Sequence, residues 1–153
     1  MEVVTCPAVL TTQHRRTKVV IFVAGGISNC TNWQDEIIEL LRAGDSDDLV
    51  LVNPRRDDFD VTNPDMSAQQ ITWEHAHLEA ADEILFWFPK ETLCPITLFE
   101  LGKYCRDDEK MIYVGCHPEY ARKFDVEHQL KMVDRQRPVV TSLEELAAQV
   151  LAG

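Results

Sequence analysis

Short apolar runs alternate along the chain with segments of helical periodicity. Five runs have the length and composition of strands that are buried on both faces of a sheet: Val19–Val23, Leu49–Val52, Ile84–Phe88, Met111–Val114 and Pro138–Val140. Five further segments place apolar residues at helical spacing: Trp33–Arg42, Ser67–Ala81, Thr97–Tyr104, Val126–Val133 and Ser142–Leu151. The last segment opens with the S-x-x-E pattern of a helix N-terminus, Ser142 with Glu145.

This alternation predicts the fold. Strands separated by helices form a parallel sheet with right-handed crossovers, and the helices cover both of its faces. We therefore expect one α/β domain over residues 18–153, a flavodoxin-like or Rossmann-like three-layer sandwich with a five-stranded, mostly parallel sheet. A chain of 153 residues is long enough to bury one core. Residues 1–17, with Pro7 and a polar stretch, are expected to form an N-terminal arm or edge element.

Composition and charge narrow the range of partners. The formal net charge of −11 would repel a phosphate backbone, so we expect no nucleic acid partner. No apolar run approaches the roughly 20 residues that span a bilayer, and the N-terminus lacks the apolar stretch of a signal peptide. We therefore expect no membrane association and a cytoplasmic location.

The cysteines and histidines do not indicate a metal or disulfide site. The five cysteines form no C-x-x-C pair, which argues against a disulfide framework and a structural zinc site and fits a reducing compartment. His75 and His77 are two positions apart, so on a helix they do not share a face. We expect no metal. Cys94 and Cys116 follow expected strands, but no Cys-His-Asn arrangement can be read from the sequence.

Open parallel sheets bind ligands in the crevice beyond the carboxyl ends of their strands. Two of the segments that follow expected strands are Ala24–Ser28 and Asn53–Arg56. Gly25 and Gly26, with Ile27 beside them, permit close approach of a ligand to the backbone, although a tight turn alone would explain both glycines. The stretch matches neither the GxGxxG pattern nor the P-loop, which disfavours a dinucleotide or a nucleoside triphosphate.

Two glutamates are candidate catalytic groups. Glu100 lies in an apolar stretch after the third expected strand and should face the crevice, ionised at modest cost near a helix N-terminus. An ionised carboxylate held in place can attack an anomeric carbon. Glu74, on the preceding helix, could donate a proton to a departing group or bind a sugar. Simpler explanations are a favourable helix dipole for Glu100 and a solvated helix charge for Glu74.

Other side chains near the strand ends could contact a ligand. Four could stack on a planar ring, although aromatic residues there more often belong to the core: Trp33, Trp87, Phe88 and Pro89. Trp73 could approach the same crevice together with Glu74. Asn53 and Arg55 follow the second expected strand, and arginine could bind a carboxylate or a phosphate. Asp57 and Asp58 come next, so local pairing with Arg55 and Arg56 is the favoured interpretation.

Five motifs, taken in order, carry a family resemblance: A-G-G-I, N-P-R-R, Q-I-T-W-E, A-D-E-I-L-F-W-F-P and I-T-L-F-E-L-G. Over Lys18–Gln129 they resemble the nucleoside 2-deoxyribosyltransferase family, in particular its branch of short bacterial proteins. The resemblance implies that Glu100, in the E-L-G motif, attacks the anomeric carbon. It also implies that Glu74 matches the acid that serves the base or the sugar, where many members carry aspartate. Asp82 matches an aspartate with a structural role.

Two positions depart from the family pattern. Cys94 stands where better-known members have an aspartate six residues before the nucleophile, and Phe22 or Ile21 stands where they have a tyrosine hydroxyl on the first strand. Both departures concern base preference and the tuning of the nucleophile. Family members typically form homo-oligomers in which a neighbour's C-terminal region completes the pocket, so His117–Gln129 is expected near the neighbouring active site.

The resemblance implies transfer of 2-deoxyribose between nucleobases through a covalent intermediate on Glu100. The ligands are then 2′-deoxynucleosides and free nucleobases, and no cofactor is needed. The expected substrate-binding residues are Gly25, Gly26, Ile27, Trp33, Asn53, Arg55, Trp73, Phe88, Pro89 and Cys94.

Two alternatives stay open. Water could accept the sugar, which would give a nucleoside or nucleoside 5′-monophosphate N-glycosidase with the phosphate near Ser28, the glycine amides and Arg55. A non-catalytic nucleotide-binding module could also have kept the fold.

Overall fold

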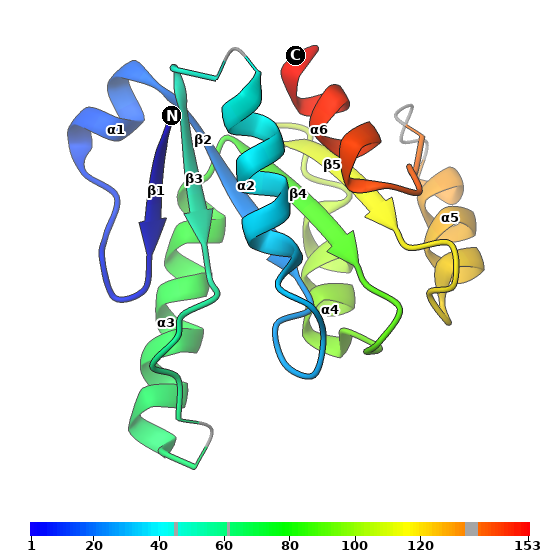
Figure 1. Ribbon diagram of the computed structural model, residues 1–153, viewed down its shortest axis with the longest axis horizontal. Helices are drawn as coiled ribbons and strands as arrows, with labels where there is room; N and C mark the ends of the chain where they lie inside the picture. Colours follow the sequence, from blue (N-terminus) through cyan, green and yellow to red (C-terminus); the bar gives the residue numbers. More distant parts are fainter. Residues whose placement is uncertain (45, 61, 134–137) are drawn as a thin grey trace.

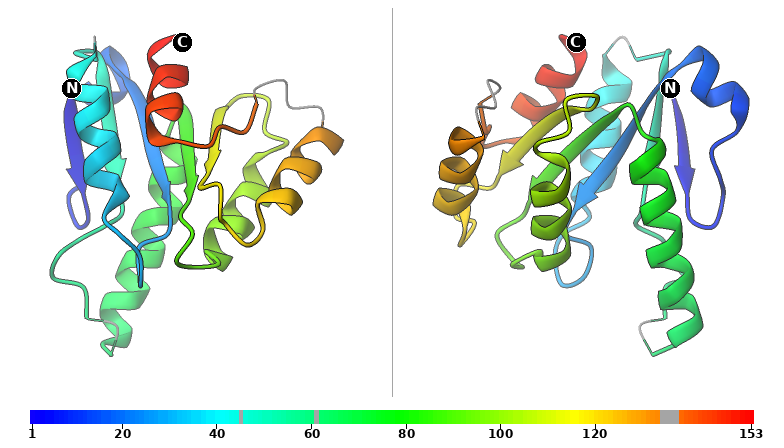
Figure 2. Two further views of the ribbon diagram at one scale, coloured as in Figure 1. Left: turned by 45° about the vertical axis from the view of Figure 1, so that its right-hand side comes forward. Right: turned by 180° about the vertical axis from the view of Figure 1, so that it is seen from behind.

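The structure, a computed structural model, describes residues 1–44, 46–60, 62–133 and 138–153. In chain order its elements are β1 (Glu2–Thr5), α1 (Thr12–Thr17), β2 (Val19–Gly25), α2 (Trp33–Ala43), β3 (Leu49–Asn53), α3 (Pro64–Ala80), β4 (Glu83–Phe88), α4 (Pro95–Tyr104), β5 (Met111–Cys116), α5 (Lys123–Met132) and α6 (Leu143–Leu151). They form three layers, with α2 and α6 on one face of the sheet and α3, α4 and α5 on the other (Figure 1, Figure 2).

The five strands of the described chain are all parallel, in the order β1-β3-β2-β4-β5. Without β1, the remaining strands follow the flavodoxin-like order, in which the first strand lies between the second and the third. The expected α/β sandwich with a five-stranded sheet is confirmed.

One expected strand is wrong. Pro138–Val140 forms no strand, because only Val140 pairs with the sheet, through an isolated bridge to Gly115. Pro138 has no N–H to donate to a ladder, and the chain enters α6 directly after Ser142. The fifth strand is instead β1, which pairs in parallel with β3 at the edge of the sheet.

The two helices that carry the candidate glutamates begin earlier than their apolar periodicity predicts. α3 begins at Pro64, and the side chain of Asn63 caps it by accepting hydrogen bonds from the backbone N–H groups of Asp65 (3.0 Å) and Met66 (3.2 Å). α4 begins at Pro95. Proline suits the first position of a helix because its missing N–H would have no partner there. The added turn of α3 extends beyond the carboxyl edge of the sheet (Figure 1).

Alternate residues of β2 belong to the two cores. Ile21 and Val23 pack with α2 and α6, whereas Val20, Phe22 and Ala24 pack with α3, α4 and α5. All five are almost fully buried. Phe22 and Ala24 therefore approach the carboxyl edge on the α3–α4 side of the sheet.

The winding of the chain opens a crevice between β2 and β4. β2 leads into α2 on one face, whereas β4 leads into α4 on the other (Figure 2). The two strands are neighbours, with Gly25 opposite Trp87 at their carboxyl ends. Their loops therefore separate at this edge, and such a point is where open α/β sheets bind ligands. None of the helices in the described ranges has the length and apolar character needed to cross a membrane.

Candidate active site

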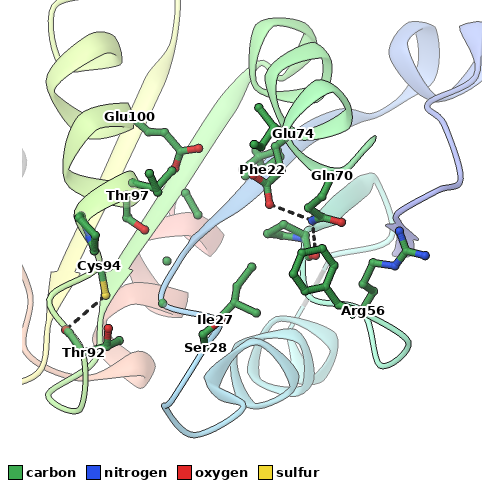
Figure 3. Close-up of a pocket in the computed structure, with 18 of the residues that line it drawn as sticks. Phe22, Ile27, Ser28, Arg56, Gln70, Glu74, Thr92, Cys94, Thr97 and Glu100 are labelled. Atoms are coloured by element: carbon green, nitrogen blue, oxygen red, sulfur yellow. Dashed lines mark hydrogen bonds between the residues drawn. The ribbon is translucent and has the colours of Figure 1, made fainter. Parts of the chain in front are cut away.

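A cavity of about 370 Å³ opens at this edge, within the usual size range of small-molecule sites. Its walls come from the ends of β2 and β3, from α3, and from the β4–α4 loop with the start of α4 (Figure 3). Glu74 from α3 and Glu100 from α4 both line it. The fold thus brings together the two carboxyl groups that the sequence predicts to be catalytic.

A glutamine holds the Glu74 carboxyl group in place. Gln70 and Glu74 lie one turn apart on the same face of α3. The Gln70 Nε2 group donates hydrogen bonds to Glu74 Oε1 and to the carbonyl of Pro54 after β3, both at 2.8 Å. Burial raises the pKa of Glu74, and the hydrogen bond from Gln70 partly opposes that rise.

The pKa of Glu100 is raised to about 8, first by burial and then by the negative charge of Glu74, against a smaller opposing effect of Lys103. The sequence predicts an ionised Glu100, and the structure differs for a physical reason. Glu100 is the sixth residue of α4, and the favourable effect of a helix dipole falls off within the first turn. Because like charges in a low dielectric disfavour one another, Glu74 and Glu100 are not both ionised at neutral pH.

A second contact joins α3 and α4 at their C-terminal ends. Glu79 Oε1 accepts hydrogen bonds from Lys103 Nζ (2.5 Å) and from the Tyr104 hydroxyl (2.8 Å). These hydrogen bonds, that of Lys103 first, lower the pKa of Glu79 to about 2. We call this group, Glu79 with Lys103 and Tyr104, the α3–α4 clasp, because it connects the two helices whose other residues carry the cavity glutamates.

The glycine loop after β2 is held from behind the cavity. The carbonyl of Gly26 accepts hydrogen bonds from Trp33 Nε1 (2.8 Å), Gln34 Nε2 (3.1 Å) and Arg55 Nη2 (3.5 Å). At Gly25 a Cβ atom would lie 2.2 Å from the Trp33 ring. Glycine is therefore required at Gly25 by close packing, and Trp33 and Arg55 support the loop.

Both arginines after β3 have protein partners. Arg55 also donates from Nε to Gln34 Oε1 (2.8 Å) and from Nη2 to the carbonyl of Thr31 (3.1 Å). Arg56 lines the cavity but forms a two-pronged pair with Asp58, at 2.6 and 2.8 Å. The local pairing expected for Arg56 is confirmed, whereas Arg55 contacts the β2–α2 loop instead of an aspartate.

The expected binding residues divide into two groups. Four line the cavity: Gly25, Gly26, Ile27 and Cys94. Six lie outside its lining: Trp33, Asn53, Arg55, Trp73, Phe88 and Pro89.

Two of the outer group show why they lie outside the lining. The Trp73 Nε1 group donates to the carbonyl of Ala8 (2.5 Å), and its ring stacks on His77 with centroids 4.0 Å apart. Phe88 is fully buried against Tyr120. Trp73 and Phe88 therefore belong to the core, which is the simpler explanation given for aromatic residues near strand ends.

Cys94 supplies a neutral surface where the family resemblance expects a carboxylate. It caps α4 in the left-handed region, with φ 49° and ψ 54°, a conformation that is uncommon outside glycine. Burial is the main cause that raises the pKa of its thiol to about 12. The preceding residue, Leu93, is anchored by the hydroxyl of Tyr120, which donates to its carbonyl (2.9 Å). Tyr120, in the segment expected to serve a neighbour, thus contacts its own chain.

Several cavity residues were not singled out from the sequence. Gln70 lies four residues before Glu74, and Thr97 lies three residues before Glu100. Helical spacing puts each on the same face as its glutamate, which is a signal that could have found them. Phe59 and Thr92, from the loops after β3 and β4, had no comparable signal.

In the part of the chain that the structure describes, no group of three or more His, Cys, Asp or Glu side chains could hold a metal ion. The polar side chains that line the cavity are those of Ser28, Arg56, Ser67, Gln70, Glu74, Thr92, Cys94, Thr97 and Glu100.

Comparison with known proteins adds one finding. A family model described as nucleoside 2-deoxyribosyltransferase like matches residues 18–120, about two thirds of the chain. The match includes every residue that lines the cavity. None of the curated proteins matches the chain.

Burial of Glu100 should reduce stability at alkaline pH. A carboxyl group whose pKa rises from 4.5 in the unfolded chain to about 8 in the folded one favours folding at low pH, and this advantage is lost as the pH rises toward 8. Even one unit of that shift is worth about 1.4 kcal/mol. We expect Glu100→Gln to raise the melting temperature at pH 9 by roughly 4 °C, and much less at pH 5.

The measurement is thermal unfolding between pH 5 and pH 9, with Glu36→Gln as the control because Glu36 is exposed on α2. A gain for Glu100→Gln that is the same at all pH values would contradict the raised pKa.

Proposed function

Because the chain belongs to the nucleoside 2-deoxyribosyltransferase-like family, we propose that it transfers 2-deoxyribose between nucleobases by a double displacement at Glu100. The observation that carries the proposal is the placement of Glu100 and Glu74 in one cavity at the carboxyl edge of the sheet. A nucleophile and a proton donor are the two groups that cleavage of an N-glycosidic bond requires.

In the first displacement, ionised Glu100 attacks C1′ of a 2′-deoxynucleoside. The bond from C1′ to the base breaks, an ester bond from C1′ to Glu100 forms, and protonated Glu74 donates its proton to the departing base. In the second displacement a nitrogen of another base attacks C1′, Glu74 takes up the proton of that nitrogen, and Glu100 leaves as a carboxylate. The active form thus has one proton on the pair, on Glu74. Because the pKa of Glu100 is raised to about 8, the proton favours Glu100 at rest, and the active form is the minor of the two one-proton forms.

The contacts of Arg55 and Arg56 argue against the alternative substrate, a nucleoside 5′-monophosphate. That alternative assigns the phosphate in part to Arg55, whose guanidinium group donates to Gln34, to Gly26 and to Thr31. The other nearby guanidinium group, of Arg56, pairs with Asp58. We therefore favour an uncharged nucleoside as substrate, since binding a phosphate through either arginine would break existing contacts.

Removal of the Glu100 carboxylate should abolish transfer. With deoxyinosine plus adenine, and with thymidine plus cytosine, we expect chromatography to detect new deoxynucleosides, and Glu100→Gln to lower kcat/KM by at least roughly 1,000-fold because the nucleophile is lost. Glu36→Gln, on the opposite face of the sheet, should keep full activity.

Three outcomes would redirect the proposal. Free base without a new nucleoside would identify water as the acceptor and the protein as a hydrolase. Stabilisation by nucleosides without any cleavage would favour a binding module. Full activity of Glu100→Gln would exclude Glu100 as the nucleophile.

Activity should depend on pH through the same group. Below about pH 8, the pKa of Glu100, the pair keeps one proton, and above that pH it keeps none. Because Glu74 then has no proton to donate, kcat/KM should fall about tenfold per pH unit above that value. Glu74→Gln has no such proton to lose, so this alkaline limb should disappear while kcat falls. An alkaline limb that persists in Glu74→Gln would contradict a proton shared by the pair.

We also propose that the protein acts as a homo-oligomer. Three large apolar side chains at and beside the cavity mouth, Ile71, Ile96 and Phe99, are 66%, 65% and 73% exposed. Phe124, in the segment expected to approach a neighbour, is 74% exposed on the same helical layer. Exposed apolar groups concentrated on one layer are typical of an interface.

Phe124→Glu should therefore weaken assembly. A buried charge at an interface is unfavourable, so we expect light scattering to give a lower mass at micromolar concentration, together with lower transfer activity. Val9→Glu is the control, because Val9 is 65% exposed in the loop after β1. A wild-type protein that is monomeric in the same measurement would contradict the proposed oligomer.

A further inference from the structure

Thr97 shares the inner face of α4 with Glu100. The two residues are three positions apart, so their side chains are neighbours on the helix surface, about 5–6 Å apart at Cβ. Both line the cavity, and Figure 3 shows them side by side at its wall. Thr97 is only 4% exposed. A polar side chain thus lies beside the proposed nucleophile.

The hydroxyl group of Thr97 forms no hydrogen bond with the residues that the structure describes. Threonine in a helix commonly donates to the carbonyl four residues earlier, as Thr72 does to Ala68 (2.8 Å). Thr97 is the third residue of α4, so the residue four positions earlier, Leu93, lies outside the helix and offers no such carbonyl. The hydroxyl is not among the fully buried polar atoms that lack a partner, so it is accessible from the cavity that Thr97 lines. A ligand in the cavity can therefore supply its partner.

The stereochemistry of the reaction identifies the ligand atom. A nucleophile that displaces the base approaches C1′ from the sugar face opposite the base. In a 2′-deoxynucleoside the base and C5′ occupy one face of the ring, and the 3′-hydroxyl is the single hydroxyl group on the other. A side chain next to Glu100 on the same helix face meets that second face of the sugar.

We propose that the Thr97 hydroxyl binds the 3′-hydroxyl of the deoxyribosyl group and so aligns C1′ with the Glu100 carboxylate. This inference rests on the proposed function and adds a sugar-binding group to it. A neutral hydroxyl suits the task, because a further carboxylate here would add like charge beside Glu74 and Glu100. Correct orientation of C1′ would then depend on a contact two carbon atoms away from it.

The test pairs a substitution with a change in the substrate. Thr97→Val keeps the shape of the side chain and removes the hydroxyl, and Thr97→Ser keeps the hydroxyl. We expect Thr97→Val to lower kcat/KM about tenfold for a 2′-deoxynucleoside, the effect of one lost hydrogen bond, and to change it less than about twofold for the 2′,3′-dideoxynucleoside. Thr97→Ser should keep the wild-type ratio of kcat/KM between the 2′-deoxynucleoside and the 2′,3′-dideoxynucleoside. Thermal unfolding of each variant verifies that it is folded.

Equal losses on both substrates, or no loss on either, would overturn the inference. If the wild type cleaves neither nucleoside, the proposed function fails, and calorimetric affinities decide the inference separately. In that case Thr97→Val should weaken the binding of the deoxynucleoside about tenfold and leave the binding of the dideoxynucleoside unchanged. Equal effects on the two affinities, or no binding of either nucleoside to the wild type, would overturn it.

Discussion

Two carboxyl groups in one partly buried cavity constrain the whole site. The pKa of Glu100 rises because its charge would be poorly solvated and would face the charge of Glu74, and such a pair is stable at neutral pH when it shares a proton. This condition suits a reaction that needs one ionised and one protonated acid at once. It also implies that the folded protein is less stable than it would be with neutral groups there, as is usual where strain serves a site.

Polar side chains around the cavity mostly hold the scaffold. Arg55, Trp33 and Gln34 converge on a single carbonyl, that of Gly26, and Gln70 connects Glu74 to the end of β3. Rigid support of this kind keeps reactive groups in position and limits the reorganisation that a reaction requires. Polar and aromatic residues that could bind a ligand can thus serve the site by holding its backbone and carboxyl groups in place.

Much of the fold follows from the sequence, because buried strands and amphipathic helices have distinct periods. The S-x-x-E pattern correctly locates the start of α6, where Ser142 accepts from Glu145 N at 3.2 Å. Residues 1–17 are expected as an arm or edge element, but the strand β1 within them is not predicted, because it has only four residues, two of them exposed. In the site, the position of Glu100 soon after a buried strand and the family resemblance at Glu74 and Glu100 locate the two acids, whereas Trp73 and Phe88 could not be assigned to core or cavity. That choice depends on which way a side chain points after packing.

The α3–α4 clasp couples the separation of the two acids to the packing of the helices that carry them. Glu79 lies five residues after Glu74 on α3, and Lys103 lies three residues after Glu100 on α4. A small shift of one helix relative to the other changes the distance between the two carboxyl groups, and their electrostatic interaction changes with that distance. The acidity of the site can therefore diverge among related proteins whose cavity linings are identical.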